Sequence, residues 1–333
     1  MTRFGLQLPS FTFAGVPDAE MFDRVTEIAQ AAEVSGFDSF WVMDHYHQIA
    51  NVGPVTEPML EAYTTLAAVA ARTSRIKLGA MVTGVTYRNP AFLAKVVTTL
   101  DVISSGRAIL GIGAAWNEEE SRAYGYDWPS VAERFERLED ALQICRAMFT
   151  QPQTTFKGAV HHVEGAYNVP QPVQPGGPKI LIGGGGERKT LRLVAQYADM
   201  WNGFGDVALV RHKLDVLAQH CQATGRDPGD IFTTRLGTLI IAPTKDEAER
   251  RRAAWMRAHD VDEASLSARL IWGDPQGVGD MAQAFLDAGL DGLIFNMPTG
   301  SSPEDVVLAG RTLTERFGTD ERAERSTGLP DRG

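Results

Sequence analysis

The feature that most constrains the fold of this 333-residue chain is a regular alternation of short aliphatic segments with longer amphipathic ones. Such an alternation predicts βα units whose strands run parallel in one sheet. Eight strands are expected, at Arg3–Leu8, Ser39–Met43, Ile76–Thr83, Ala108–Gly113, Lys179–Ile182, Met200–Phe204, Phe232–Ile241 and Gly292–Asn296. Eight helices are expected to follow them, near Asp18–Ser35, Met59–Arg72, Ala91–Ser104, Val131–Phe149, Arg188–Tyr197, Val207–Thr224, Lys245–His259 and Glu304–Phe317. Because a doubly wound sheet usually uses fewer strands, this pattern favours a closed (β/α)8 barrel of the TIM type.

Two segments interrupt the alternation, and loops as long as these are usually functional lids or contacts. Thr150–Pro178 is rich in glycine and proline, so we expect an inserted loop or hairpin after the fourth helix. Asp260–Asp274 precedes an additional helix expected near Gln276–Ala288. Residues 1–317 are therefore expected to form one α/β barrel domain, followed by a polar, poorly ordered tail at 318–333.

The charge and hydropathy of the chain exclude several kinds of partner. A net charge of −10 makes nucleic acid and anionic membrane surfaces unexpected partners. The first residues lack the apolar core of a signal peptide, and no apolar run is long enough to span a bilayer. Cys145 and Cys221 show no metal or redox spacing, so both are expected to be buried free thiols. We therefore expect a protein of the reducing cytoplasm.

Polar residues follow the second expected strand, where a barrel carries its active site. The segment DHYH at residues 44–47 places Asp44 beside His45, and such a pair can orient a cofactor and move a proton near neutral pH. One alternative is a polar strand end with solvated histidines, and another is a metal site at His45 and His47. Further ligands at other strand ends are lacking, since His161 and His162 fall in the insertion, so no metal is expected.

The fifth expected strand is joined to the fifth helix by Gly183, Gly184, Gly185 and Gly186. Glycines allow consecutive backbone N–H groups to face an anion at a helix N-terminus, so we predict a phosphate site here. Arg188, with Lys189, is expected to add positive charge, and a simple tight turn is the alternative. Because Arg188 stands where a P-loop requires glycine, a nucleotide kinase is not favoured.

The end of the fourth expected strand carries a second glycine motif. Trp116 occupies the place of the third glycine of a dinucleotide-binding fingerprint, so a Rossmann site is not supported. Gly111 and Gly113 are expected to let a flat ring system approach the backbone, with Asn117 either contacting the ring or capping the next helix. The acidic run Glu118–Glu120 is interpreted as a solvated helix face.

The third expected strand is followed by Arg88-Asn89-Pro90. Asn89 is expected to cap the third helix and Pro90 to begin it, since proline suits the first helical position. Arg88 is open to two interpretations, an anion-binding side chain or a surface arginine.

Taken together, these segments resemble the luciferase-like monooxygenase superfamily, in particular its F420-dependent oxidoreductase branch. The resemblance runs from Phe4 to Asn202 and continues more faintly beyond, and the run TLDVISSGRAILGIGAAW is a specific signature. Other matching segments are FGLQLPSF, AAEVSGFDSFWVMDH, RFERLEDAL and PKILIGGGGERKTLRLVAQYADMWN. The resemblance implies binding of coenzyme F420, a deazaflavin, and assembly into a homodimer.

The resemblance also implies roles for particular residues. It implies a non-prolyl cis peptide at Met81-Val82, shaped as a bulge that supports the central ring of the cofactor. It makes His45 the catalytic residue. The cofactor-binding residues that it implies are Asp44, Met81, Val82, Thr83, Ala114, Ala115, Asn117, Gly183, Gly184, Gly185, Gly186 and Arg188.

One departure bears on the substrate. The sugar-phosphate dehydrogenases of this family carry a Glu shortly before the Asn of the fourth strand, whereas this chain has Trp116. Their strand-1 Glu is also missing, with Pro9 and Ser10 in its neighbourhood. Their activity is therefore not expected here, and Trp116 suggests an apolar or aromatic substrate.

The expected function is F420-dependent oxidoreduction, with hydride passing between the deazaflavin C5 and a small organic substrate, most simply as a reductase. The first alternative is a monooxygenase that uses reduced FMN on the same barrel. The run Gly183–Gly186 favours F420, because FMN users of the superfamily more often place Ser or Thr there. The second alternative is a non-catalytic flavin- or deazaflavin-binding protein, against which the Asp44-His45 pair argues.

Overall fold

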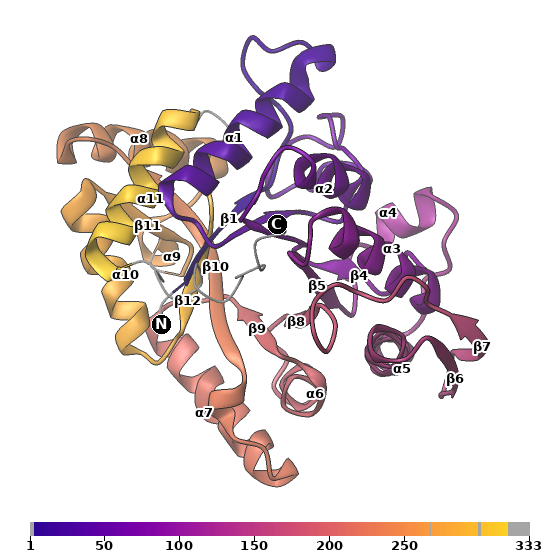
Figure 1. Cartoon of the computed structure of the whole chain (residues 1–333). Helices are drawn as coiled ribbons and strands as arrows, with labels where there is room; N and C mark the ends of the chain where they lie inside the picture. Colours follow the sequence, from indigo (N-terminus) through magenta and orange to yellow (C-terminus); the bar gives the residue numbers. More distant parts are fainter. Residues whose placement is uncertain (1–2, 267, 299–300, 319–333) are drawn as a thin grey trace, which may run out of the picture.

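The computed structural model describes residues 3–266, 268–298 and 301–318, and its centre is a closed barrel of parallel strands (Figure 1). Each strand pairs in parallel with its neighbours, and β12 closes the ring between β10 and β1. The barrel strands are β1 (Arg3–Leu8), β2 (Ser39–Val42), β3 (Lys77–Ala80), β5 (Ala108–Gly113), β8 (Lys179–Gly183), β9 (Met200–Gly203), β10 (Phe232–Ile241) and β12 (Gly292–Asn296). The predicted (β/α)8 barrel is confirmed.

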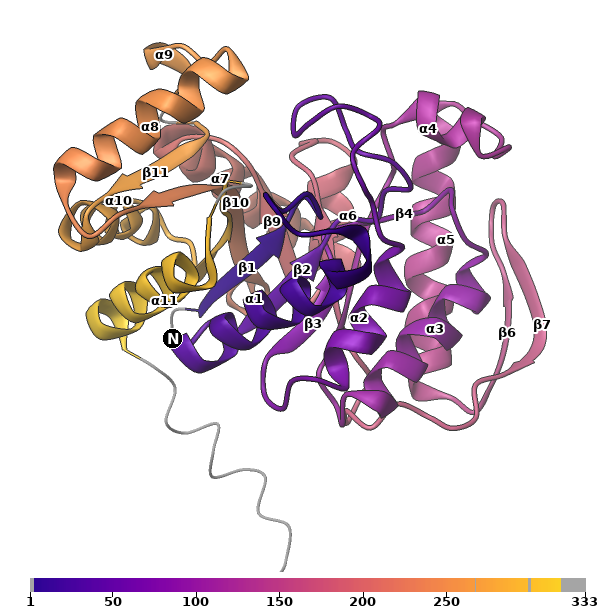
Figure 2. The ribbon, with the colours of Figure 1, turned by 90° about the horizontal axis from the view of Figure 1, so that it is seen from above.

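Helices surround the barrel, as the alternation predicts (Figures 1 and 2). They are α1 (Met21–Ser35), α2 (Ala62–Ala70), α3 (Pro90–Ile103), α5 (Val131–Thr150), α6 (Thr190–Tyr197), α7 (Val207–Thr224), α8 (Lys245–His259), α10 (Pro275–Asp287) and α11 (Pro303–Phe317). Asn89 caps α3 by accepting from the amides of Ala91 and Phe92, and Pro90 is its first residue, as expected. The expected tail lies outside the described residues from 319 onward.

The barrel interior is filled by side chains from several strands. Trp41, Ile109, Leu181 and Ile294 form a buried cluster inside the ring, separate from the larger core between strands and helices. The Trp41 indole crosses the barrel so closely that a Cβ on Gly79 would lie 2.5 Å from its ring. The interior is therefore a packed core, and only the end of the barrel is left for a ligand.

The predicted insertion after the fourth barrel helix is a hairpin. Its strands β6 (Gln153–Lys157) and β7 (His162–Tyr167) pair antiparallel and lie beside α5 (Figure 2). Asp140 of α5 holds the hairpin turn, accepting from the amides of Val160 and His161 at 2.7 and 2.8 Å. The buried carboxylate thus fixes the insertion to the barrel wall.

The segment after α8 differs from the expected loop. It contains α9 (Glu263–Leu266) and a short strand, β11 (Leu270–Gly273), which pairs with the last residues of β10. The ten-residue β10 outlasts its barrel neighbours, so its free edge accepts this additional strand. The segment and the β6–β7 hairpin lie on opposite sides of the barrel (Figure 2).

The third strand is shorter than predicted. It ends at Ala80, and the chain turns at a cis peptide between Met81 and Val82 before β4 (Thr83–Gly84) joins β5. The predicted non-prolyl cis bond is confirmed, whereas the strand is interrupted there instead of continuing to Thr83. Cys145 and Cys221 are buried free thiols, as expected. Among the described helices, none has the length and apolar character needed to cross a bilayer.

Candidate active site

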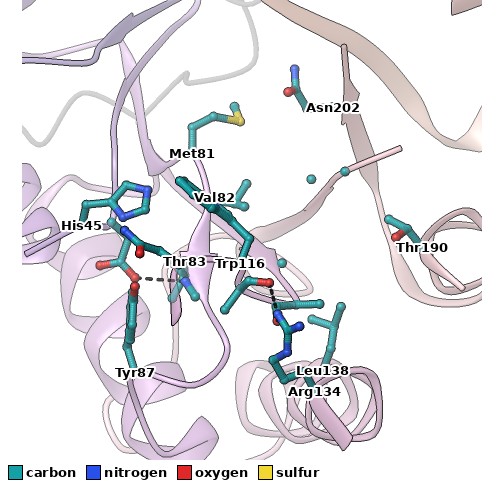
Figure 3. Close-up of a pocket in the computed structure, with 18 of the residues that line it drawn as sticks. His45, Met81, Val82, Thr83, Tyr87, Trp116, Arg134, Leu138, Thr190 and Asn202 are labelled. Carbon is teal, nitrogen blue, oxygen red and sulfur yellow. Dashed lines mark hydrogen bonds between the residues drawn. The ribbon is translucent and has the colours of Figure 1, made fainter. Parts of the chain in front are cut away.

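A cavity of about 470 Å³ lies at the C-terminal ends of the strands, where the sequence places the site (Figure 3). The predicted site residues that it brings together are Asp44, His45, Met81, Val82, Thr83, Ala114, Ala115, Asn117, Gly183 and Gly184. Gly185, Gly186 and Arg188 do not line the cavity, and Arg188 is exposed beyond its edge. No group of three or more His, Cys, Asp or Glu side chains within the described part of the chain could hold a metal ion.

Val82 forms the floor of the cavity, and its side chain leaves no room for a Cβ at the neighbouring glycines. A Cβ on Gly183 would lie 2.8 Å from Val82 Cγ1, and one on Gly113 would lie 3.0 Å from Val82 Cγ2. A Cβ on Gly111 would lie 2.1 Å from the carbonyl oxygen of Ala80. The interpretation that Gly111 and Gly113 admit a ligand ring is therefore corrected, because packing within the protein already requires both glycines.

His45 is held by a carboxylate that the sequence interpretation placed in solvent. Its Nδ1 lies 2.7 Å from Glu120 Oε2, and the Glu120 side chain is 0% exposed. The Tyr87 hydroxyl donates to the same oxygen at 2.6 Å, and the amides of Tyr46 and His47 donate to Oε1. Glu120 is thus a buried anchor, and His45 is not a solvated strand-end histidine.

The charge of Glu120 follows from these contacts. Burial raises the pKa of this carboxyl, but hydrogen bonds from His45 and Tyr87 outweigh it and lower the pKa to about 2. A carboxylate at Oε2 accepts the proton of His45 Nδ1, which leaves Nε2 without a partner among the described residues. The arrangement is a His–Glu dyad, and the imidazole ring of His45, with its free Nε2, lines the cavity.

Glu120 was missed because of its sequence context, although one signal pointed to it. It lies in α4 (Glu118–Ala123), a six-residue helix whose acidic run the sequence interpretation assigned to a solvated face. Asn117 caps this helix by accepting from the Glu120 amide, which confirms the capping alternative. An Asn followed three residues later by Glu matches the capping-box spacing, and that spacing could have singled out Glu120. In the fold its carboxylate binds His45 instead of the cap.

Asp44 is committed to an ion pair at the cavity edge. Arg88 binds both of its oxygens, at 2.7 and 2.9 Å, and the Gly84 amide donates to Oδ2 at 3.1 Å. Burial raises the pKa of Asp44, and the charge and hydrogen bonds of Arg88 oppose that rise. The Arg88 side chain is only 10% exposed, and it also binds Glu61 at 2.7 Å, so the surface interpretation of Arg88 is wrong.

Arg134 is a cavity-lining cation that the sequence interpretation did not single out. It lies in the first turn of α5, with its guanidinium 4.2 Å from the centre of the Trp128 ring and Nη1 donating to the carbonyls of Ala115 and Ala114 (Figure 3). Its buried Nε has no hydrogen-bond partner among the described residues, and no carboxylate pairs with the side chain there. Nothing in the sequence separates Arg134 from other helix arginines, because only the barrel brings it to the strand ends.

Only part of the glycine run keeps backbone amides free for the anion that the sequence predicts. The Gly184 amide donates to the Asn202 carbonyl at 3.0 Å, so it is not available to a phosphate. The amides of Gly185 and Gly186 donate to no described residue, and they lie just before the N-terminus of α6. Free amides therefore remain just outside the cavity lining, next in sequence to Gly184, which with Thr190 forms part of its wall.

A closed parallel barrel with a buried dyad and an unpaired arginine at its strand ends defines a barrel-enzyme site. The profile of the luciferase-like monooxygenase family matches residues 2–319, so the chain belongs to this family.

The relatives within the family include enzymes named for F420. The chain is 30% identical over 308 residues to an F420-dependent glucose-6-phosphate dehydrogenase of Kineococcus radiotolerans, covering 84% of this chain and 89% of that protein. It is 30% identical to the protein of the same name from Nocardia farcinica, covering 90% and 96%.

Solved structures share the fold at low sequence identity. The F420-dependent tetrahydromethanopterin reductase of Methanopyrus kandleri superposes with a TM-score of 0.79 at 19% identity, over 95% of this chain and 99% of that one. EDTA monooxygenase of Chelativorans sp. superposes with a TM-score of 0.81 at 18% identity, over 95% and 94%. The same barrel thus serves differently named oxidoreductases.

Proposed function

We propose that this protein is an F420-dependent oxidoreductase, which acts as a reductase on a small organic substrate. The observation that carries the proposal is the His45–Glu120 dyad in a cavity that ends at the free amides before α6. The names of its relatives at 30% identity support the choice of cofactor. The alternative, a reduced-FMN monooxygenase, is supported by the family itself, which is named for luciferase-like monooxygenases.

The residues of the cavity fit a flat cofactor with an anionic tail. The walls near Val82, Ala114 and Leu138 are apolar, which suits a ring system. Arg134 has an unpartnered buried Nε, and the amides of Gly185 and Gly186 are free of described acceptors. These groups would bind the phosphate of the tail. When bound, a deazaflavin supplies or accepts a hydride at its ring carbon C5.

The dyad supplies the proton that a hydride transfer requires. Reduction of a double bond adds a hydride to one atom and a proton to the other, and protonated His45 can deliver that proton from Nε2. Glu120 holds the imidazole through Nδ1, so that Nε2 is the nitrogen that faces a substrate. Neutral His45 then regains a proton from solvent, which restores the dyad for the next turnover.

Parallel titrations of the purified protein with F420 and with FMN test the choice of cofactor. We expect saturable binding of F420, much tighter than that of FMN, followed by fluorescence. Tight FMN binding without F420 binding would overturn the proposal in favour of the monooxygenase. F420 binding with no oxidation of reduced F420 by any acceptor would favour the non-catalytic alternative.

We also propose that the protein is a cytoplasmic homodimer. The support is the family resemblance together with the buried free thiols Cys145 and Cys221, which suit a reducing compartment. Light scattering during gel filtration is expected to give about twice the mass of one chain, and the mass of a single chain would contradict the dimer.

A further inference from the structure

A second cavity adjoins the first one at the dyad. Its volume is about 780 Å³, and its lining overlaps that of the first cavity. The residues common to both linings are His45, Met81, Trp116, Phe204 and Leu236. A molecule in the second cavity would therefore meet a cofactor in the first at His45 and Met81, where a proton donor is present.

The wall of the second cavity is apolar and aromatic. Besides Trp116 and Phe204, its apolar members are Met43, Ile49, Val52, Leu209, Leu236, Trp255 and Met297. Trp116 is 62% and Phe204 57% exposed, which is unusual for large aromatic side chains of a folded protein. The Trp116 ring meets the His45 ring edge-on, with centroids 5.6 Å apart. Exposed rings beside a proton donor favour a planar or cyclic apolar ligand.

The polar groups in this cavity are few and mostly neutral. Asn296 Oδ1 accepts from Thr238, so its amide N–H groups are left to donate to a ligand. Gln7 donates to the Met81 carbonyl, which leaves its oxygen as an acceptor. Such groups orient a neutral ligand by one or two hydrogen bonds.

The charges in this cavity limit the substrate further. Arg269 is the one Lys or Arg in its lining, as far as the described residues go, and neither Asp nor Glu lines it there. Arg269 is exposed, and its side chain pairs with no carboxylate among the described residues. A phosphate dianion in a closed site normally requires several cationic or amide donors. A cationic ligand would lack a carboxylate partner.

Resting on the proposed function, we infer that the second cavity is the substrate chamber and takes ring-bearing aldehydes, ketones or enones. These substrates are neutral or carry a single carboxylate, which Arg269 meets at the rim. The hydride of the reduced deazaflavin adds to the electrophilic carbon, and the π electrons pass to oxygen or to the α-carbon. His45 protonates that atom, so the product is an alcohol or a saturated carbonyl compound.

The test uses the holoenzyme with reduced F420 and a set of acceptors of graded chemistry. Cinnamaldehyde, cyclohex-2-enone, benzaldehyde and 4-formylbenzoate are expected to restore the absorbance of oxidised F420. Glucose 6-phosphate with oxidised F420 is expected to give no turnover. Turnover of glucose 6-phosphate but of none of the ring compounds would overturn the inference and the reductase direction, and it would leave F420-dependent oxidoreduction standing. Failure to bind F420 would instead remove the proposed function.

Two variants locate the substrate. Trp255→Ala removes a wall that only the second cavity contains, and it is expected to raise KM for cinnamaldehyde about tenfold. An unchanged dissociation constant for F420 shows that this variant is folded. Arg269→Ala is expected to raise KM for 4-formylbenzoate about two- to fivefold and to leave that for benzaldehyde unchanged. Unchanged KM values in both variants would place the substrate elsewhere.

Discussion

The adjacent residues Asp44 and His45 each make a buried ionic contact, but only one of the two remains available for proton transfer. Asp44 is bound by Arg88 through both oxygens, so its role is to hold the strand end in place. His45, next to it, binds Glu120 through Nδ1 and keeps Nε2 free. Proton transfer is therefore assigned to His45 and not to the Asp44 carboxylate.

Replacing His45 with Ala tests proton transfer. General acid–base catalysis typically accelerates a reaction about 10²- to 10⁴-fold, so the single-turnover rate is expected to decrease by a factor of that size. The dissociation constant for F420 is expected to stay close to that of the unaltered protein, since the walls of the first cavity remain. Weakened binding with preserved chemistry would mean that His45 only packs against the cofactor.

The Glu120 carboxylate is expected to make the free energy of unfolding depend on pH. The pKa of this carboxyl is about 2 in the folded protein, below the usual 4.5. The stabilisation that its charge provides is therefore complete at pH values above 4.5. This contribution is lost as pH falls from about 4.5 toward about 2. Urea unfolding of the unaltered chain and of Glu120→Gln across this window is the measurement. The unaltered chain should lose more stability than the variant, and parallel losses in the two chains would contradict the assignment.

Arg134 and Arg188 form a matched pair for locating the cofactor tail. Arg134→Met keeps the aliphatic stem but removes a cation of the cavity wall, and it is expected to cost about 1.5–3 kcal/mol of F420 binding. Arg188→Met removes an exposed cation beyond the cavity edge, so a smaller loss is expected. F420 titrations at moderate salt distinguish them. A larger loss for Arg188 would place the phosphate outside the cavity, at the position expected from sequence.

Among the elements, the break between β3 and β4 shapes the site most. It places Val82 under the cavity, and the next two strands of the barrel, β5 and β8, carry glycines where Val82 packs. The long β10 and short β11 add a wall to the second cavity, which includes Thr238 of β10 and Arg269 just before β11. The break after β3 and the extension of β10 beyond its neighbours thus shape the two cavities.

A pair of glycine substitutions tests the contact between β8 and this break. Gly183→Ala adds a Cβ 2.8 Å from Val82 Cγ1, so it is expected to cost about 1–3 kcal/mol of stability by overpacking and to weaken F420 binding. Gly185→Ala is the control, because its Cβ would meet nothing closer than Lys213 Cε at 3.9 Å. Urea unfolding gives both free energies, and equal values would show that Val82 moves without cost.

For the whole molecule, closure of the barrel brings together the parts of the site. His45 and Glu120 are 75 residues apart in sequence, yet they share a hydrogen bond because β2 and β5 end at the same face. The same closure brings Arg134 of α5 to that face, while the β6–β7 hairpin stays outside α5 (Figure 2). The insertion therefore does not contribute to either described cavity.

The sequence alone determined the elements and the face of the barrel that carries the site. β1, β5, β10 and β12 have the predicted bounds, since apolar runs between amphipathic helices define strands locally. The motif at Asp44-His45 and the cis bond at Met81-Val82 were also predicted, the bond from family resemblance.

Only the tertiary structure decided which polar side chains are buried and which partners they have. Glu120 and its neighbours Glu118 and Glu119 look alike in sequence, but only Glu120 faces inward, to His45. Likewise, Arg88 pairs with Asp44, which is distant in sequence. Arg134 is held at the cavity by the carbonyl of Ala115, which lies in another element. Burial and pairing of charges depend on long-range packing, which local patterns of hydrophobicity do not encode.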